Sequence, residues 1–539
     1  MRYLLSNLQC ELGEEKSNLA LLIARALGGQ TADYQRIVLE RQSLDARHKG
    51  AIHLSCSFSF ESDRTLPAGP RPGGARLELA PAPVSTTVAR VSTPPRVVVV
   101  GTGPAGSFCA LRLLDYGIAP VVLERGPAME QRITAVERLW NHGVLDPDAN
   151  AQFGEGGAGT FSDGKLTTRI NHPATRHVLE TFVRLGAPAR ILVQARPHVG
   201  TDVIRRCSVA LRSEAETRGA QYRFGQALHD LRVDGDGRLR AALLASGEEI
   251  PCDALVLAPG HSARDTFEML HAHGVAMEPK PFALGVRVEH PQELIDRSQY
   301  GRSVGHPSLP VADYRLSCNF DDQRAVYSFC MCPGGEVIQC SSEPGCVVVN
   351  GMSTAARASG LANAGVVAKV TTEDFASEHL LGGVYFQRRW EQAAFRAAGE
   401  SYGAPAMAVQ DFVQGRASGL IPRQSFRPHA VPADLETCLP GVVHAQLLRA
   451  LPIFERKLHG FTGREALMLG VESRTSSPVR LLRDARGQSL THPGLYPCGE
   501  GAGYAGGITS AAVDGIRVAE WIARAAGAPV FEPFVKQRR

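Results

Sequence analysis

The sequence lacks the features that mark several large classes of protein. Its 539 residues contain no apolar stretch approaching the roughly 18 residues that a membrane-spanning helix requires. Residues 1–15 carry one positive charge and only a short apolar stretch before acidic residues, unlike a secretory signal peptide. Lys and Arg are scattered without long basic runs, and the net charge is only +4. We therefore expect neither a membrane nor a nucleic-acid partner.

Composition favours a soluble globular protein of two or three domains, with 44% apolar and 21% charged residues. Residues 1–63 predict a small α+β module with a strand, a helix and two further strands, at Tyr3–Leu8, Ser17–Leu27, Gln35–Arg41 and Ala51–Glu61. Residues 64–95 contain seven prolines and little apolar pattern. That composition predicts an extended linker before the main domain begins at Arg96.

A dinucleotide-binding fingerprint opens the main domain. Val97–Val100 predict a strand buried on both faces. The strand leads through Gly101, Gly103, Pro104, Ala105 and Gly106 into a helix, and a second strand ends at Glu124. The glycines allow a tight turn, close approach of the backbone to a pyrophosphate, and close helix packing. Glu124 can accept hydrogen bonds from a ribose. With Arg125 next to it, this segment alone leaves both NAD and FAD open.

Two later segments favour FAD. A short strand at Leu495–Pro497 is followed by a glycine-dense loop and a helix, with predicted cofactor contacts at Gly499, Glu500, Gly506, Gly507, Ile508, Thr509 and Ser510. Glu500 can bond the polyol of a flavin, and the helix N-terminus can face the flavin pyrimidine and stabilise reduced flavin. A buried strand ending in Ala258, Pro259 and Gly260 is the third cofactor segment that we predict.

Several longer segments resemble the bacterial family of uncharacterised FAD-dependent dehydrogenases. They are Gln152–Leu166, Gly260–Thr266, Cys330–Gly335, Val471–Arg480 and the C-terminal glycine loop, and the likeness covers essentially the whole chain. The resemblance implies the architecture of succinate dehydrogenase and fumarate reductase flavoproteins, but not their substrate. The chain departs from flavoproteins in general at Glu500, where Asp is usual, and in its proline-rich linker.

The resemblance also implies that a second glycine-rich loop lies along the isoalloxazine edge. The predicted contacts are Gly156, Gly157, Ala158, Gly159, Thr160, Ser162, Asp163, Gly164 and Lys165. Lys165 would place a positive charge near flavin N1 and C2=O, where negative charge develops on reduction. The alternative is a solvated surface lysine after a turn.

Three further side chains are candidates for catalysis. Arg474 and Arg480 flank a polar turn, and a pair of arginines near a flavin can grip a substrate carboxylate. Each can instead be a structural ion-pair partner. His261 follows the third flavin segment and is a candidate acid or base, or else a cap or surface residue.

The cysteines give no metal motif. The chain has 12 of them without regular spacing, typical of reduced thiols in a cytoplasmic protein. Cys330, Cys332, Cys340 and Cys346 do not match the paired CxxC patterns of zinc or iron–sulfur sites. We predict no metal, and expect buried or cavity-lining thiols, with redox exchange with the flavin as the alternative.

The predicted fold is α/β, with a Rossmann-type FAD-binding domain (96–269 and 466–539) interrupted by an α+β cap or substrate domain (270–465). No second strand–GxGxxG–helix unit is visible, so electrons must pass to or from a small-molecule substrate, a transiently bound NAD(P)H or another donor or acceptor. The predicted function is a dehydrogenase or reductase that transfers a hydride between flavin N5 and an unidentified small molecule. A flavin monooxygenase and a non-catalytic FAD-binding scaffold protein are the alternatives. The substrate and the oligomeric state stay open.

Overall fold

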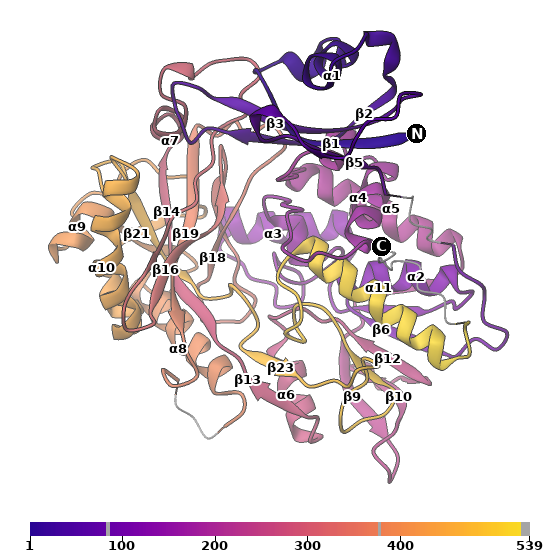
Figure 1. Ribbon diagram of the computed structural model, residues 1–539. Helices are drawn as coiled ribbons and strands as arrows, with labels where there is room; N and C mark the ends of the chain where they lie inside the picture. Colours follow the sequence, from indigo (N-terminus) through magenta and orange to yellow (C-terminus); the bar gives the residue numbers. More distant parts are fainter. Residues whose placement is uncertain (82–86, 376–378, 530–539) are drawn as a thin grey trace.

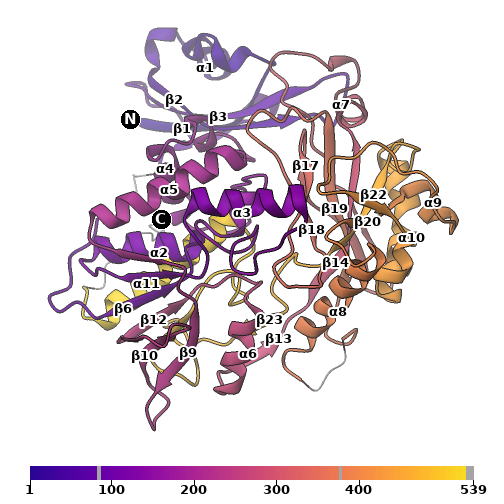
Figure 2. The ribbon, with the colours of Figure 1, turned by 180° about the vertical axis from the view of Figure 1, so that it is seen from behind.

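The computed structural model describes residues 1–81, 87–375 and 379–529 (Figure 1). Three parts are visible: an N-terminal module, a domain built on a parallel sheet, and a cap built on a long antiparallel sheet. Figure 2 shows the same arrangement from behind, with the N-terminal module lying across the other two parts. No helix among the described residues combines the length and apolar character needed to cross a bilayer.

The N-terminal module is a five-stranded antiparallel sheet with one helix. The strand order is β2-β3-β1-β5-β4, with β1 at Arg2–Cys10, β2 at Gln35–Asp45, β3 at His53–Glu61, β4 at Gly69–Pro70 and β5 at Arg76–Leu79. Helix α1 (Leu19–Leu27) buries Ile23 in the same core as Leu5 and Phe58. The predicted strand–helix–strand–strand order is therefore present.

The predicted linker begins too early. Leu77 of β5 pairs with Leu5 of β1 and is fully buried, so β4 and β5 belong to the module. Proline content misled the prediction because β4 and β5 are short and lie at one edge of the sheet, where proline is tolerated. The module extends to about residue 80, and residues 82–86 of the predicted linker lie outside the described residues.

The parallel sheet has the order β24-β12-β6-β7-β8, with β6 at Val97–Val100, β7 at Val121–Glu124, β8 at Gln221–Phe224, β12 at Ala254–Leu257 and β24 at Leu495–Pro497. Helices α2 (Pro104–Asp115) and α11 (Ile508–Ala525) lie side by side on one face (Figure 1). Val97 and Val99 pack toward them, whereas Val98 and Val100 pack with the small antiparallel sheet of β9 (Leu228–Val233), β10 (Leu239–Leu244) and β11 (Glu249–Pro251). All four valines are buried, as their pattern predicts.

Two further helices, α4 (Ala174–Arg184) and α5 (Thr201–Thr217), cover the parallel-sheet domain on the side of α2 (Figure 2). Helix α3 (Met129–His142) instead packs Val136, Leu139 and Trp140 with residues of the cap such as Ile338 and Cys340. Phe108 of α2, Phe182 of α4, Ile204 of α5 and Val513 of α11 share one apolar core. This core fixes the N-termini of α2 and α11 relative to each other.

The cap is a seven-stranded sheet in the order β15-β16-β19-β14-β22-β20-β21. Its strands are β14 (Phe282–Pro291), β15 (Ser317–Asn319), β16 (Ala325–Cys332), β19 (Leu361–Val370), β20 (Ala404–Ala408), β21 (Ala430–Pro432) and β22 (Leu467–Glu472). The remaining cap elements are α7 (Gln292–Tyr300), β17 (Glu336–Gln339), β18 (Val349–Met352), α8 (Gly382–Ala397), α9 (Val409–Gln414) and α10 (Gly441–Lys457).

Both predicted cap boundaries shift. Helix α6 (Arg264–Ala272) and β13 (Met277–Pro279) pack in the core beneath the parallel sheet, so the cap begins near Phe282 rather than at residue 270. Strand β22 lies between β14 and β20, so the cap ends near Glu472 rather than at residue 465. Beyond it, β23 (Val479–Leu481) pairs with β13, and this ribbon joins the two chain crossings between the domains.

Candidate functional site

A cavity of about 370 Å³ lies at the carboxyl ends of β6, β7 and β12, where nucleotides bind in open parallel sheets. It is lined by the N-termini of α2 and α11 and by residues of the cap. Of the residues predicted to hold the cofactor, the lining includes Gly101, Gly103, Pro104, Ala105, Glu124, Arg125, Gly157, Ala158, Gly159, Ser162, Asp163, Lys165, Ala258, Pro259, Gly260, Glu500, Gly506, Gly507 and Ile508.

The first glycine turn has the close packing that its sequence predicts. Gly101 has φ 99°, and a Cβ there would lie 2.2 Å from the carbonyl oxygen of Ala258. A Cβ at Gly106 would lie 1.9 Å from the carbonyl oxygen of Gly101, so Gly106 brings α2 against the strand without lining the cavity. Gly103 does line it, and the nearest atom to a Cβ at Gly103 would be 3.9 Å away. A ligand can therefore approach the backbone at Gly103.

The Glu124 carboxylate accepts hydrogen bonds from other residues of the protein. One carboxylate oxygen accepts hydrogen bonds from the N–H and the hydroxyl of Thr102, at 3.1 and 2.6 Å. The other accepts from the N–H groups of Gly126 and Gly154, both at 3.0 Å. A carboxylate has about four acceptor positions. Glu124 therefore ties the first glycine turn to the second loop, which differs from the predicted role of accepting hydrogen bonds from a ribose.

Arg125 forms the wall beside Glu124. Its guanidinium lies over the ring of Phe153, 4.4 Å from the ring centroid, and pairs with Asp265 of α6 at 2.8 Å. Gln226 and Leu228 complete this end of the cavity. These side chains present a flat, partly apolar surface of the kind that an adenine ring can pack against.

Some residues of the second glycine-rich loop line the cavity, and others hold the loop in its conformation. Gly156, Thr160 and Gly164 do not line the cavity, contrary to the expectation of cofactor contact. A Cβ at Gly156 would lie 2.5 Å from Thr160, and one at Gly164 would lie 2.9 Å from the N–H of Gly200. The hydroxyl of Thr160 accepts a hydrogen bond from Arg132 at 2.7 Å. These three residues hold the loop in shape, so that the residues between them face the cavity.

Lys165 and Asp163 form a charged pair at the cavity wall. Asp163 is fully buried, contacts the Lys165 ammonium, and accepts a hydrogen bond from Ser353. His198 Nε2 lies 2.6 Å from the same carboxylate. Burial alone would raise the pKa of Asp163, but Lys165 and His198 outweigh it and hold that pKa below its usual range. Burial opposes the charge of Lys165, but Asp163 raises its pKa, so Lys165 stays a cation at the cavity.

His261 lines the cavity but is a poor proton donor. Burial, followed by the charges of Arg474 and Arg264, lowers its pKa to about 3. The imidazole is therefore neutral near neutral pH. The predicted acid role is not supported, because the protonated form that would donate is scarcely populated.

Arg474 reaches the cavity from a buried ion-pair network. Its guanidinium donates to Glu391 of α8 at 3.0 Å and to the Ser342 hydroxyl at 2.5 Å. Arg264 of α6 binds the same Glu391 at 2.7 Å. Arg480 lies outside the cavity and pairs with Glu278 at 3.1 Å, with its side chain 40% exposed. Arg474 lines the cavity and Arg480 does not, so the structure does not bring the two guanidinium groups to one substrate carboxylate, and each has the ion-pair partner that the structural alternative predicts.

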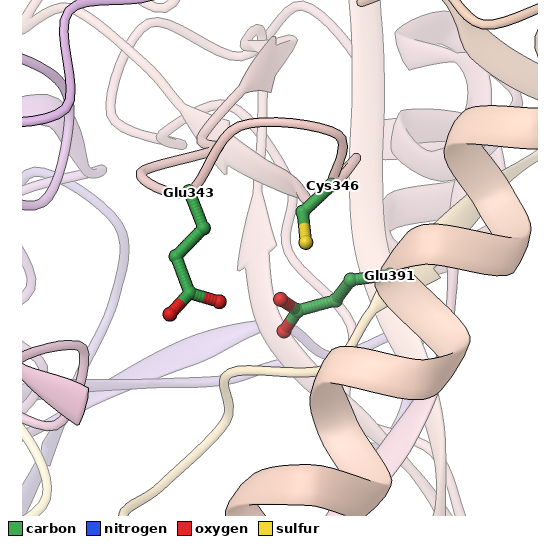
Figure 3. A group of neighbouring side chains, drawn as sticks. All are labelled: Glu343, Cys346 and Glu391. Carbon is green, nitrogen blue, oxygen red and sulfur yellow. The ribbon is translucent and has the colours of Figure 1, made fainter. Parts of the chain in front are cut away.

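Glu343, Cys346 and Glu391 bring one ligand atom each within 4.8 Å of one another (Figure 3). The two glutamates face each other from a cap loop and from α8, with Cys346 beside them. Glu343 pairs with Arg264 at 2.6 Å and with Arg388 at 2.8 Å, and Glu391 pairs with Arg264 and Arg474. Because three guanidinium groups already neutralise these carboxylates, the cluster is an ion-pair network rather than a cation site.

The C-terminal loop supplies a third acidic residue at the cavity. Glu500 lines the cavity, and burial raises its pKa to about 7 although Lys280 opposes that rise. Gly499, Thr509 and Ser510 do not line the cavity, contrary to the expectation of cofactor contact. The Gly499 N–H donates to Asp514 at 2.8 Å, the Thr509 hydroxyl to the Leu166 carbonyl at 2.7 Å, and the Ser510 hydroxyl accepts from the Gly506 N–H at 3.1 Å. These contacts fix the loop and the start of α11.

Some lining residues were missed by sequence reasoning. They include Gln226, Phe329, Asn350 and Thr475, which come from segments without glycine motifs. Cys330 lines the cavity, as the cavity-lining alternative for the thiols predicts, whereas Cys332 is fully buried.

The residues present fit FAD. Glycine backbone at Gly103 and Gly157 leaves room for a pyrophosphate, and a Cβ at Gly157 would lie 2.9 Å from Gly103 and fill that gap. Glu500 would hold the polyol. The first turn of α11, at Gly507 and Ile508, directs the positive end of its helix dipole into the cavity, where the pyrimidine of a flavin would be held.

A family model described as FAD-dependent protein, C-terminal domain-like, matches residues 281–475, which correspond to the cap. A protein of Clostridium beijerinckii whose function is uncharacterised is 42% identical over 525 residues, which cover 96% of this chain and 98% of that one.

The chain also has low-level similarity to solved structures of flavoproteins. The flavin-dependent brominase Bmp2 is 14% identical, with a TM-score of 0.36 and coverage of 82% of each chain. The open conformation of a flavocytochrome c3 fumarate reductase is 13% identical, with a TM-score of 0.32 and coverage of 81% of this chain and 79% of that one. On the evidence of the cap match and the full-length relative, the chain belongs to this family of FAD-dependent proteins, and FAD is its cofactor.

Proposed function

We propose that the protein is an FAD-dependent oxidoreductase, a dehydrogenase or reductase that acts on a small-molecule substrate. The observation that carries the proposal is the composition of the cavity, which joins the dinucleotide fingerprint to cap side chains. Phe329, Cys330 and Asn350 of the cap line the same cavity as Gly101 and Gly103. A small molecule bound against the cap would therefore share the cavity with the cofactor. When bound, FAD supplies hydride transfer at N5.

The chain's own residues would provide electrostatic stabilisation. The Lys165 ammonium, held by the buried Asp163, keeps a positive charge at the cavity. The N-terminus of α11 adds a fixed partial positive charge. Both favour negative charge that develops next to them, and neither needs to reorganise during the reaction.

Anaerobic reduction of the purified protein tests the proposal. We expect a yellow protein whose flavin absorbance bleaches with at least one donor from a panel of NADH, NADPH, small alcohols, hydroxy acids and amines. Oxygen uptake coupled to hydroxylation of a product would instead indicate a monooxygenase. A folded protein that stays colourless with micromolar FAD would overturn the proposal.

Substitutions at Lys165 test its proposed electrostatic role directly. Lys165→Met should slow bleaching by the active donor by about tenfold to a hundredfold, because a preorganised charge is lost. Lys165→Arg keeps the charge and should recover most of the rate. Equal rates for Lys165→Met and the wild type would remove Lys165 from the proposed role.

A further inference from the structure

Strand β16 contains a β-bulge at Cys330. Phe329 pairs with Gly365 of β19, and the next pair is Cys332 with Asn363, so β16 has one extra residue between them. Cys330 has φ 43°, which is uncommon for a residue with a side chain. Bulges near ligand sites re-aim side chains. Here Cys330 lines the cavity, whereas Cys332 is fully buried behind it.

The two thiols are coupled to each other and to two cations. A hydrogen bond from the Cys332 thiol, helped by Lys165 and Arg287 and opposed by burial, lowers the pKa of Cys330 to about 5. Burial, followed by the hydrogen bond to Cys330, raises the pKa of Cys332 well above its ordinary value. Arg287 is also anchored nearby, because its guanidinium donates to the Cys330 carbonyl at 2.8 Å. Of the two thiols, Cys330 is therefore the one that more readily loses its proton.

Other cap thiols lack this environment. Burial raises the pKa of both Cys340 and Cys346 to about 12, and neither lines the cavity. An accessible thiolate with a protonated thiol behind it is the arrangement from which a disulfide forms most readily.

We propose that Cys330 and Cys332 form a redox-active dithiol that exchanges two electrons with the FAD; this inference rests on the proposed function. Lys165 acts electrostatically on Cys330, and Arg287 binds both the Cys330 carbonyl and the Asn350 side chain. The charge of Cys330 acts in turn on Glu500, the residue assigned to the polyol. Cys330 therefore lies near the residues assigned to the flavin half of the site rather than near Arg125.

The exchange balances in atoms and electrons. One S–S bond forms between Cys330 and Cys332, and the S–H bond of Cys332 breaks. The two electrons and that proton pass to oxidised flavin, which becomes the anionic reduced form. In the reverse direction, reduced flavin returns two electrons and one proton to the disulfide, which opens to a thiolate and a thiol.

Reductive titration tests the dithiol on the intact holoprotein. The protein is oxidised with ferricyanide, desalted, and titrated anaerobically with dithionite while flavin absorbance is followed. The wild type should take up about four electrons per FAD, because flavin and disulfide each accept two. Cys330→Ser and Cys332→Ser should each take up about two. Cys318→Ser, a buried thiol of β15 outside the cavity, should keep the wild-type value.

A second readout is independent of the flavin. Alkylation of the oxidised wild type under denaturing conditions, followed by peptide mass spectrometry, should find Cys330 and Cys332 linked and unalkylated. A yellow wild-type protein that takes up only about two electrons, with both thiols alkylated, overturns the dithiol and leaves the proposed function standing. A folded protein that binds no FAD overturns both.

Discussion

Two of the acidic residues that line the cavity, Glu124 and Glu500, have opposite environments. Glu124 accepts four hydrogen bonds from the protein and holds two loops together. Glu500 is half-buried at the cavity wall, and its position there raises its pKa, which Lys280 only partly offsets. A carboxylate saturated by protein donors supports the shape of a site, whereas a poorly solvated one favours a ligand that brings donors.

Glu500 makes the stability of the FAD-free protein depend on pH. Its pKa is about 7 in the folded chain, above the ordinary value of the unfolded chain, so the folded state holds the extra proton between about pH 5 and 7. Stability contributed by this group is present at low pH and is lost as pH rises through 7. As pH rises from 5 to 8, the free energy of unfolding of the wild type should fall by about 2 kcal/mol relative to that of Glu500→Gln, as measured by urea unfolding. Glu278→Gln, at an exposed pair, should show no such trend, and a flat difference for Glu500→Gln would contradict the assignment.

Local motifs made part of the site predictable. Gly101, Gly103, Lys165 and Glu500 follow strands or glycine turns closely in the sequence, and all four line the cavity. Arg474 also lines the cavity, but its ion-pair partner Glu391 could not be identified from the sequence because it lies 83 residues away on α8. Asn350 was missed because β18 carries no recognisable motif, and only the packing of the cap brings it to the cavity. Sequence motifs report local geometry, whereas ion-pair partners and cap contacts depend on tertiary packing.

At the scale of elements, the site depends on how closely α2 and α11 pack. A Cβ at Gly515 of α11 would lie 2.0 Å from the carbonyl oxygen of Ala105 in the first turn of α2. The helix periodicity predicted α11, and the sequence predicted its strand β24 with the observed bounds. Neither motif alone predicts that the two helices touch. Arg112 of α2 and its partner Glu520 of α11 are 408 residues apart in the sequence.

Gly515→Ala should therefore force the two helices apart. We expect a loss of about 1–3 kcal/mol in the free energy of unfolding, because a methyl group cannot fit against backbone, together with weaker retention of FAD. Urea unfolding and flavin fluorescence after dialysis measure the two effects. Gly441→Ala at the first turn of α10, where a Cβ meets open space, should stay within about 1 kcal/mol of the wild type. Equal behaviour of the two variants would contradict the close packing.

At the scale of the whole molecule, one buried carboxylate connects the cap to the parallel-sheet domain. Glu391 of the cap helix α8 binds Arg264 of α6 and Arg474 beyond β22, and all three side chains are almost fully buried. The sequence predicted that a cap interrupts the nucleotide fold, but it placed both boundaries in the wrong elements. The sequence placed β22 at the start of the second part of the FAD-binding domain. Its pairing with β14 and β20 shows that it belongs to the cap.

Glu391→Gln should loosen this connection. Removing the charge leaves the buried guanidinium of Arg474 without a carboxylate and that of Arg264 with Glu343 alone, which costs about 3–5 kcal/mol in the free energy of unfolding. Arg388→Met, which removes a partly exposed guanidinium from the rim of the network, should cost less than half as much. Urea denaturation compares the two. A smaller loss for Glu391→Gln than for Arg388→Met would show that the connection lies elsewhere.

The split of the parallel sheet also sets an order for synthesis on the ribosome. Strands β6, β7, β8 and β12 emerge early, but β24 and α11, which complete the sheet and the cavity, come after the entire cap. The cap can pair all seven of its strands before then, whereas the nascent nucleotide fold must wait with one side of β12 unpaired. The complete cavity, to which Ile508 of α11 contributes, therefore exists only after α11 has been translated, later than every strand of the cap.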